Sequence, residues 1–418
     1  MSANQKNSGF HYAYLIVAAC CAIAVAPVAL TFSCAGIFFK PVTQELGVGI
    51  GTFAIYLSVM MLAASLTLIY AGKIIAQYST RIVLSICVGI IAAAFAAMST
   101  FTSVYQFYVA GAFMGVAQAF LLYLMIPTMI NRWFKTRVGF FIGICAAFTG
   151  VGGILFNPLG GYIIANYGWR SAYLAFAALT VVVALPFSLF VMKSFPGDKG
   201  LRPYGDNGET AQNGATAQIT GVPYSTAIKS GSFYVGLVFS FAVAFISNIN
   251  FYLPAYAGSL GMSVTLGATV ASASMFGNMA GKVLLGMIND KSVIGGMAFG
   301  LGCGIVGLGL MIFFAKMGAW IVLLAGALYG ISYACVSVQI PLTVKTIFGN
   351  RDYSQIYSNI AMAAALSSMI GSSAWGFVID STKSYAITFG LAMGVTALAF
   401  LSGYAAMQLG KKLNFTAK

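Results

Sequence analysis

Residues 268–291 read ATVASASMFGNMAGKVLLGMINDK, an apolar run with one lysine inside it, Lys282, followed by a polar turn that ends in Lys291. A helix needs about 20 mainly apolar residues to cross the hydrocarbon core of a bilayer, and this run is long enough. A charged side chain inside such a span is expensive to bury and is retained where it serves a function. The stretch therefore predicts a membrane-spanning helix that carries part of the functional site.

The polar turn that closes this run has a counterpart earlier in the chain. GMINDK begins at Gly286 and GKIIAQ begins at Gly72, so their residue numbers differ by 286 − 72 = 214, which we call the repeat offset. A second pair of landmarks has the same offset: Phe134 and Arg137 correspond to Phe348 and Arg351. Two separate landmarks with one offset indicate a duplicated unit whose two halves run parallel.

Eleven further runs resemble the first in length and in continuous apolar character, so we expect twelve membrane-spanning helices. Their ranges are 13–39, 51–72, 82–101, 105–129, 138–163, 171–192, 233–257, 264–288, 294–315, 319–344, 354–378 and 385–409. The runs show no alternation of polar and apolar residues, which favours helices over the strands of a barrel. The predicted fold class is an all-α membrane protein with two six-helix bundles.

The composition of the 418 residues supports this class. The chain is 60% hydrophobic and 7% charged, whereas soluble domains are about 25% charged, so most of its surface must face lipid. The net charge of +14 does not indicate a nucleic-acid partner, because the basic residues stand singly between apolar spans. All seven cysteines lie inside apolar runs and are expected to be small buried hydrophobes. We expect no cofactor and no metal site.

A single long polar segment divides the spans six and six. Residues 194–230 are rich in Pro, Gly, Asp, Asn and Thr, as in a linker. The expected organisation is an N-terminal six-helix bundle over residues 1–193, a cytoplasmic linker over 194–230 and a C-terminal six-helix bundle over 231–418.

Basic residues set the orientation, because they favour the cytoplasmic side of a membrane. With the N-terminus inside, sixteen of the 21 Lys and Arg residues are cytoplasmic, and Lys282 belongs to neither side. Four lie outside: Lys40, Arg170, Lys316 and Lys383. We therefore expect a multi-pass protein of the cytoplasmic membrane with both termini in the cytoplasm.

The polar turn at residues 286–291 resembles the loop motif of the major facilitator superfamily, Gly-x-(Leu/Ile)-x-Asp-(Arg/Lys). In that family these loops latch the ends of the two halves and have a gating and structural role. The resemblance assigns this role to Gly286, Asp290, Lys291, Arg137 and Arg351. The first-half copy departs from the motif, because its last two residues are Ala and Gln.

Four further stretches resemble one branch of that superfamily, the monocarboxylate transporters and the oxalate/formate antiporters. They are residues 36–47, 131–143, 196–204 and 348–357, so the resemblance extends over nearly the whole chain. It implies a secondary active transporter of small organic anions rather than an enzyme. In this branch a cation, usually Arg, stands where this chain has Lys282 and binds the carboxylate of the substrate.

Lys282 has two possible settings. Its side chain can face a cavity between the helices, or its long stem can reach the headgroups, since it lies six residues from the end of the span. None of the seven acidic residues lies in the middle of a span. If Lys282 faces a cavity, the missing counter-ion is the transported anion. The span over 354–378 contains no second cation, which favours a monocarboxylate over a dicarboxylate.

Polar residues near Lys282 complete the expected site. Asn278 lies one helical turn before it. Tyr123 and Tyr333 match positions where relatives place substrate-contacting tyrosines, and Tyr329 lies one turn before Tyr333. A phenol can donate a hydrogen bond to a carboxylate, although tyrosines also populate the interfacial belts of membrane proteins. Ser33, Asn248 and Gln355 are weaker candidates that also suit helix packing.

The expected mechanism is alternating access, in which the two bundles rock around a site at the middle of the membrane. Lysine can release its proton where arginine cannot, which favours a carboxylate carrier coupled to a proton; anion exchange is the alternative. The expected partners are a small organic acid anion, a proton and the lipid bilayer, and the expected unit is the monomer. A carboxylate or dicarboxylate antiporter and a neutral-solute or drug carrier on the same fold remain open alternatives.

Overall fold

A computed structural model of the protein describes residues 11–205, 220–349, 351–413 and 416–417. Residues 206–219 of the expected linker lie outside the described part. The elements up to residue 199 are α1 (Ala13–Ile23), η1 (Ala24–Val28), α2 (Ala29–Phe32), η2 (Ala35–Phe38), α3 (Phe39–Leu46), α4 (Ile50–Gln77), α5 (Thr80–Met98), α6 (Val104–Gln118), η3 (Ala119–Leu124), α7 (Met125–Trp133), α8 (Val138–Pro186), η4 (Phe187–Val191) and η5 (Pro196–Lys199). Non-helical backbone at Gly168 divides α8 into two spans.

The second part of the chain repeats this order. Its elements are β1 (Thr220–Gly221), α9 (Tyr224–Ala227), α10 (Gly231–Ser247), η6 (Asn248–Tyr252), α11 (Leu253–Ser259), α12 (Val264–Asn289), α13 (Val293–Phe313), η7 (Ala315–Met317), α14 (Ala319–Tyr333), α15 (Cys335–Phe348), α16 (Tyr353–Thr382), α17 (Tyr385–Gly410) and β2 (Thr416–Ala417). β1 and β2, two residues each, pair antiparallel. The prediction of an all-α membrane fold is confirmed, with a helix at each of the twelve expected spans.

The repeat offset reappears in the helix boundaries. α4 begins at Ile50 and α12 begins at Val264, in agreement with the offset, and the non-α segments η2 and η6 correspond at nearly the same spacing. The contacts made by the two flanks of the linker also correspond by the repeat offset. Tyr204 pairs with the backbone beside Phe134, and Val222 donates to the carbonyl of Phe348, the counterpart of Phe134 in the second half. The duplication is therefore visible in the structure and in the sequence.

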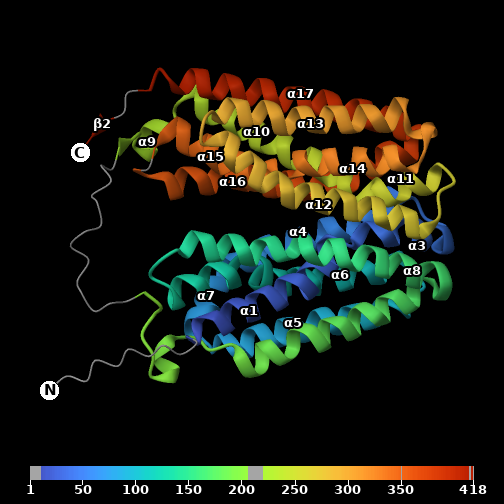
Figure 1. Ribbon diagram of the computed structural model, residues 1–418, viewed down its shortest axis with the longest axis horizontal. Helices are drawn as coiled ribbons and strands as arrows, with labels where there is room; N and C mark the ends of the chain where they lie inside the picture. Colours follow the sequence, from blue (N-terminus) through green and yellow to red (C-terminus); the bar gives the residue numbers. More distant parts are fainter. Residues whose placement is uncertain (1–10, 206–219, 350, 414–415, 418) are drawn as a thin grey trace.

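Figure 1 shows the two sets of helices, α1–α8 below and α10–α17 above, with both termini at one end of the molecule. We call this the termini end, and the opposite end, which holds α3 and α11, the far end. The described hydrogen bonds between the two sets lie in the middle and at the far end. In the middle, Ser58 bonds Ser372, and Ser272 donates to the carbonyl of Ile154. Ser58 and Ser272 are themselves related by the repeat offset, so these two contacts in the middle of the molecule are quasi-symmetric.

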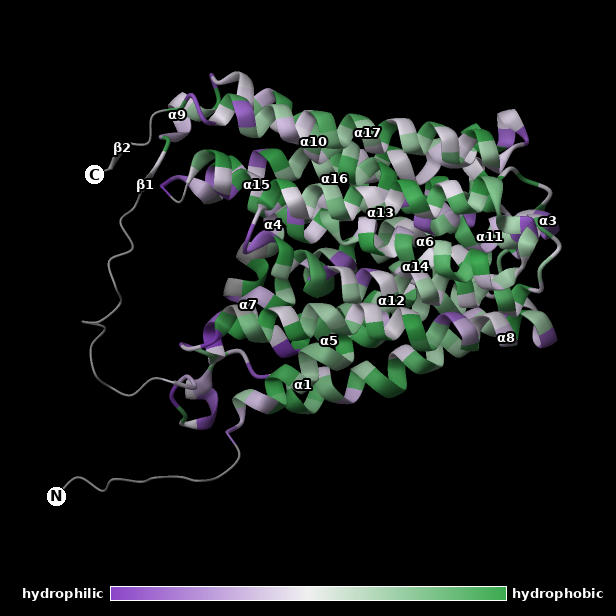
Figure 2. Cartoon of the chain, turned by 45° about the horizontal axis from the view of Figure 1, so that its top comes forward, coloured by the Kyte–Doolittle hydropathy of each residue, from purple (hydrophilic) through white to green (hydrophobic). Residues whose placement is uncertain are grey.

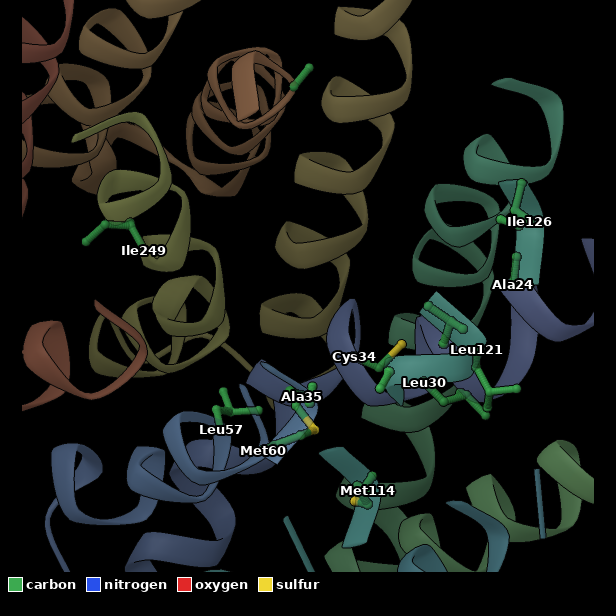
Figure 3. Close-up of a cluster of buried hydrophobic side chains, with 14 of the residues drawn as sticks. Ala24, Leu30, Cys34, Ala35, Leu57, Met60, Met114, Leu121, Ile126 and Ile249 are labelled. Carbon is green, nitrogen blue, oxygen red and sulfur yellow. The ribbon is translucent and has the colours of Figure 1, made fainter. Parts of the chain in front are cut away.

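The outer surface of the helices is apolar, as contact with lipid requires. Ten segments within the described residues are long and apolar enough to cross a membrane; one of them holds both spans of α8, and α12 is too polar to be counted. Large hydrophobic side chains such as Ile82, Ile86 and Leu398 are exposed on the outer faces. Hydrophobic residues dominate the helices and hydrophilic residues gather at the two ends (Figure 2). Inside, Leu30, Leu57 and their neighbours form a buried cluster (Figure 3).

Candidate functional site

Several membrane-spanning helices depart from regular α-helical geometry in segments that lie near the boundary between the two halves. Pro27 lies inside η1; it has no backbone N–H, so the ordinary helical hydrogen bond cannot form there. Its own carbonyl accepts from the hydroxyl of Thr31 at 2.6 Å and from the side-chain amide of Gln118 at 3.2 Å. η1 packs against η3, and such π-helical turns frequently occur at functional sites. The second half has corresponding interruptions at η6 and at Ala334, between α14 and α15.

A cavity of about 260 Å³ opens beside these interruptions. Its lining comes from both halves and mixes apolar side chains such as Phe32 and Phe251 with a set of polar ones. The polar lining residues are Ser33, Tyr123, Thr149, Ser247, Asn248, Tyr333, Ser368 and Ser372. The lining residues include no charged side chain. The cavity alone therefore suits a small solute with polar groups and an apolar part.

Two tyrosines from opposite halves line the cavity. Tyr123 lies in η3 and is 41% exposed, and its hydroxyl donates to the sulfur of Met61 at 3.9 Å. Tyr333 ends α14, and its hydroxyl has no hydrogen-bond partner among the residues that the structure describes. Both predicted tyrosines therefore line the cavity, and the hydroxyl of Tyr123 donates only to a weak sulfur acceptor.

Tyr329 is placed differently. Although it lies only one turn before Tyr333, it is buried and its hydroxyl donates to the carbonyl of Ile246. It does not line the cavity. Tyr329 thus ties α14 to α10 and has no hydroxyl proton left for a solute.

The hydroxyl and amide groups of the lining are mostly turned towards carbonyls of the helices. Ser33 donates to Thr149 at 3.3 Å, Ser247 donates to Ala244 at 2.7 Å, and the Asn248 amide also donates to Ala244 at 2.8 Å. Their oxygen atoms keep lone pairs that can still accept. The cavity therefore presents acceptors on these residues and donors on the two phenols.

Lys282 lies in α12 on the side away from lipid. The lipid-facing side of this part of α12 is marked by Val283, 63% exposed, and Met287, 56% exposed. At about 100° per residue, Lys282 points about 100° to 140° away from both. Lys282 lies on the same side of α12 as the residues that pack against α8. Among these residues, Ala268 lies against Gly161 and Met279 lies near Gly150. The side chain of Lys282 is half-buried.

The level of Lys282 along the molecule matches that of Tyr333. α12 and α14 run parallel in contact, with Gly277 against Ala327 and Gly281 against Ile331, so residue 282 stands beside residue 332. Nearer the termini end, a Cβ at Gly143 of α8 or at Gly286 of α12 would have no neighbouring atom within 4 Å. The two helices therefore diverge towards the termini end, and Lys282 stands where they separate.

Among the residues that the structure describes, Lys282 forms no ion pair and no hydrogen bond. The salt bridge found among them joins Glu45 and Arg170. The other described carboxylates are at helix ends. Asp198, Asp352 and Asp380 accept from backbone N–H groups, and Asp290 is exposed. Lys282 itself does not appear in the cavity lining, and Asn278 is buried against α14 rather than in the cavity.

The residues expected to act in gating lie at the termini end. Asp290 caps the end of α12, and both it and Lys291 are exposed. Arg137 precedes α8 with a left-handed backbone, φ 53°. Arg351 packs beside Gly221, next to the flank of the linker. The structure brings these residues to one end of the molecule.

Of the weaker candidates, Ser33 and Asn248 line the cavity, whereas Gln355 is exposed at the start of α16. The sequence analysis missed Thr149, Ser247, Ser368 and Ser372. One signal was available: the repeat offset relates Ser247 to Ser33, so the duplication pairs them. For the other three, a serine or threonine in an apolar span does not differ from the many that bond their own helix.

The sequence profile of the Major Facilitator Superfamily matches residues 21–371. The chain belongs to this superfamily. It is 26% identical over 285 residues to monocarboxylate transporter 13 of Rattus norvegicus, covering 66% of this chain and 60% of that protein. It is also 27% identical over 185 residues to the MFS-type transporter pynF of Aspergillus niger, covering 43% of this chain and 38% of that protein. The matches thus span less than two thirds of either relative.

Solved structures show the same fold. The nucleoside transporter NupG superimposes with a TM-score of 0.70 over 97% of this chain and all of that chain, at 12% identity. A D-xylose-proton symporter superimposes with a TM-score of 0.67 over 96% of this chain and 97% of that chain, at 15% identity. The family match confirms the prediction of a multi-pass membrane protein from a superfamily of transporters rather than enzymes.

Proposed function

We propose that this transporter carries a small organic monocarboxylate anion by alternating access, together with a proton. The proposal is supported by Lys282, a half-buried cation on the side of α12 that packs against α8 of the other half; Lys282 forms no ion pair among the described side chains. A buried charge is stable only with a partner, and a transient anion supplies one during transport. A single cation matches a single carboxylate.

The neighbouring cavity supports a role for the phenols. Tyr123 and Tyr333 offer donors from opposite halves, and a carboxylate is a strong acceptor that two donors can share. The apolar lining would hold the carbon skeleton of the acid. We propose that Lys282 supplies the charge and that Tyr123 and Tyr333 supply orientation, with Asn278 supporting the Lys282 turn of α12. The 26% identity to a monocarboxylate transporter agrees with this class of cargo.

The charge distribution supports the expected orientation, with both termini in the cytoplasm and the far end outside. We propose that the monomer is the working unit in the cytoplasmic membrane. Gly286, Asp290, Lys291, Arg137 and Arg351 are then placed at the cytoplasmic end, where they would contact one another or the other half when that end closes.

Counterflow in proteoliposomes tests the function. Vesicles preloaded with one acid are offered a labelled acid, across a panel of monocarboxylates, dicarboxylates, sugars and nucleosides, while internal pH is recorded. We expect saturable counterflow for monocarboxylates, with acidification of the lumen during net uptake. Counterflow for the sugars or nucleosides alone, or flux that does not saturate, would contradict the proposal.

Replacing Lys282 by arginine separates exchange from proton-coupled uptake. Arginine keeps the positive charge but does not release its proton, so the empty carrier cannot shed the charge to reorient. We expect exchange of one monocarboxylate for another to stay within a fewfold of the parent and net uptake to fall about tenfold or more. Equal loss in both assays would count against a proton-releasing role of Lys282.

Removing the Tyr333 hydroxyl tests the phenol contribution. A hydrogen bond to a charged group contributes about 1.5–3 kcal/mol, so Tyr333→Phe should raise the KM for the acid about tenfold or more while the protein keeps its Tm. Tyr329→Phe is the matched control, because its hydroxyl bonds Ile246 within the fold. That variant should lower Tm and leave KM nearly unchanged. The opposite assignment of the two effects would refute the role of Tyr333.

One observation favours a second candidate, a carrier of neutral polar solutes. The cavity lining includes no charged residue, and Lys282 is not part of it. A solute with several hydroxyl groups would match the acceptors on Ser33, Ser247 and Asn248. Such a carrier would not depend on Lys282, which distinguishes it from the anion carrier.

A further inference from the structure

Two charged residues at the far end each bind a helix end that belongs to the other half. Asp380, near the end of α16, accepts from the backbone N–H of Gly51 at 2.8 Å and of Ile50 at 3.1 Å. These are the first residues of α4, in the first half. The first N–H groups of a helix have no partner within it and carry partial positive charge, which a carboxylate stabilises.

The second contact has the opposite sign and the opposite direction. Lys40, in α3 of the first half, donates from its ammonium to the carbonyl of Gly258 at 2.6 Å. Gly258 lies in the last turn of α11, in the second half, where carbonyl groups lack α-helical partners and carry partial negative charge. Each half thus contributes one charge and one helix end.

Each contact lies beside a glycine, where the absence of a Cβ permits close approach. A Cβ at Gly49 would lie 2.5 Å from Oδ2 of Asp380, and a Cβ at Gly258 would lie 2.7 Å from Nζ of Lys40. Any other residue at Gly49 would push the carboxylate away from the N–H groups it binds. The backbone at both helix ends is therefore shaped to admit the charged group.

We propose that Lys40 and Asp380 are latches of opposite charge that hold the far end closed while the termini end is open. Opening the far end requires the two halves to separate there, and both contacts then break together. Lys40 and Asp380 are positioning residues that set the balance between the two open states. The proposal concerns the motion shared by carriers of this fold and does not depend on which solute is carried.

The same end of the molecule offers a matched control. Glu45, five residues after Lys40, pairs with Arg170 and accepts from the indole N–H of Trp169 at 2.5 Å. All three residues belong to the first half, so this cluster moves as a unit when the halves separate. Its loss removes a charged contact at the far end without removing a contact between the halves.

The test measures how readily the cavity is reached from the far end. Ser368, which lines the cavity and is partly exposed, is replaced by cysteine, and a membrane-impermeant maleimide is added on the side opposite the termini, with the parent chain as background. A charge-assisted hydrogen bond shifts such a balance about tenfold. Lys40→Met and Asp380→Asn should each raise the labelling rate about tenfold, and the double variant should raise it further.

Glu45→Gln should leave the labelling rate unchanged, and Asp380→Glu, which keeps the charge, should restore most of the slow rate. Each variant is also checked for a monodisperse profile, and Lys40→Gln, which also removes the charge, replaces Lys40→Met if the latter does not fold. Unchanged labelling in both latch variants would overturn the proposal. An equal rise in Glu45→Gln would overturn it too, because the effect would then be general loosening.

Discussion

Glutamine in place of Lys282 should reduce monocarboxylate counterflow by about 100-fold or more. Leaving one charge of a buried pair without its partner costs about 3–5 kcal/mol, and in the variant the bound anion is the charge left alone. Glutamine keeps much of the length and polarity of lysine, so the loss reports the charge. The measurement is counterflow in proteoliposomes at equal amounts of reconstituted protein.

Lys316→Gln serves as the control, because Lys316 is an exposed lysine in η7 at the far end. Its loss lowers the net charge equally and should leave counterflow near the parent level. If Lys282→Gln also transports at the parent rate, the anion proposal fails. The carrier of neutral solutes, supported by the uncharged lining of the cavity, would then be preferred.

Much of the fold was predictable because lipid imposes simple rules. Apolar runs of about 20 residues must be helices, and the repeat offset required a second half built like the first. The boundaries of α4 and α12 agree with that offset. The interruptions at η1, η3 and η6 were not predicted, because a proline or a polar residue in an apolar run does not determine whether the helix continues as an α-helix.

The site was only partly predictable for a related reason. Sequence spacing places Tyr329 and Tyr333 on one side of a helix, but it does not show which neighbour each one meets. In the structure a carbonyl of α10 takes the hydroxyl of Tyr329, while Tyr333 opens to the cavity. The direction of Lys282 was open for the same reason. The exposure of Val283 and Met287 on the other side of α12 identifies which side faces lipid.

A bulky residue at Gly277 should disrupt the contact that fixes that direction. α12 and α14 touch through glycines: a Cβ at Gly277 would overlap the carbonyl oxygen of Ala327, and a Cβ at Gly330 would overlap that of Ser274. Small residues let membrane helices approach this closely, and overpacking costs about 1–3 kcal/mol or more. Gly277→Val should therefore lower the Tm of the purified protein by several degrees and reduce its yield.

Gly302→Val in α13 is the matched control for Gly277→Val, because no atom lies within 4 Å of the position that a Cβ at Gly302 would take. It adds the same side chain to a neighbouring apolar helix and should leave Tm nearly unchanged. Equal stability of the two variants, measured by thermal unfolding in detergent, would show that α12 and α14 do not touch through glycine. The orientation of Lys282 would then lose its support, because Gly277 and Gly281 place that turn of α12 against α14 and direct the lysine between the halves.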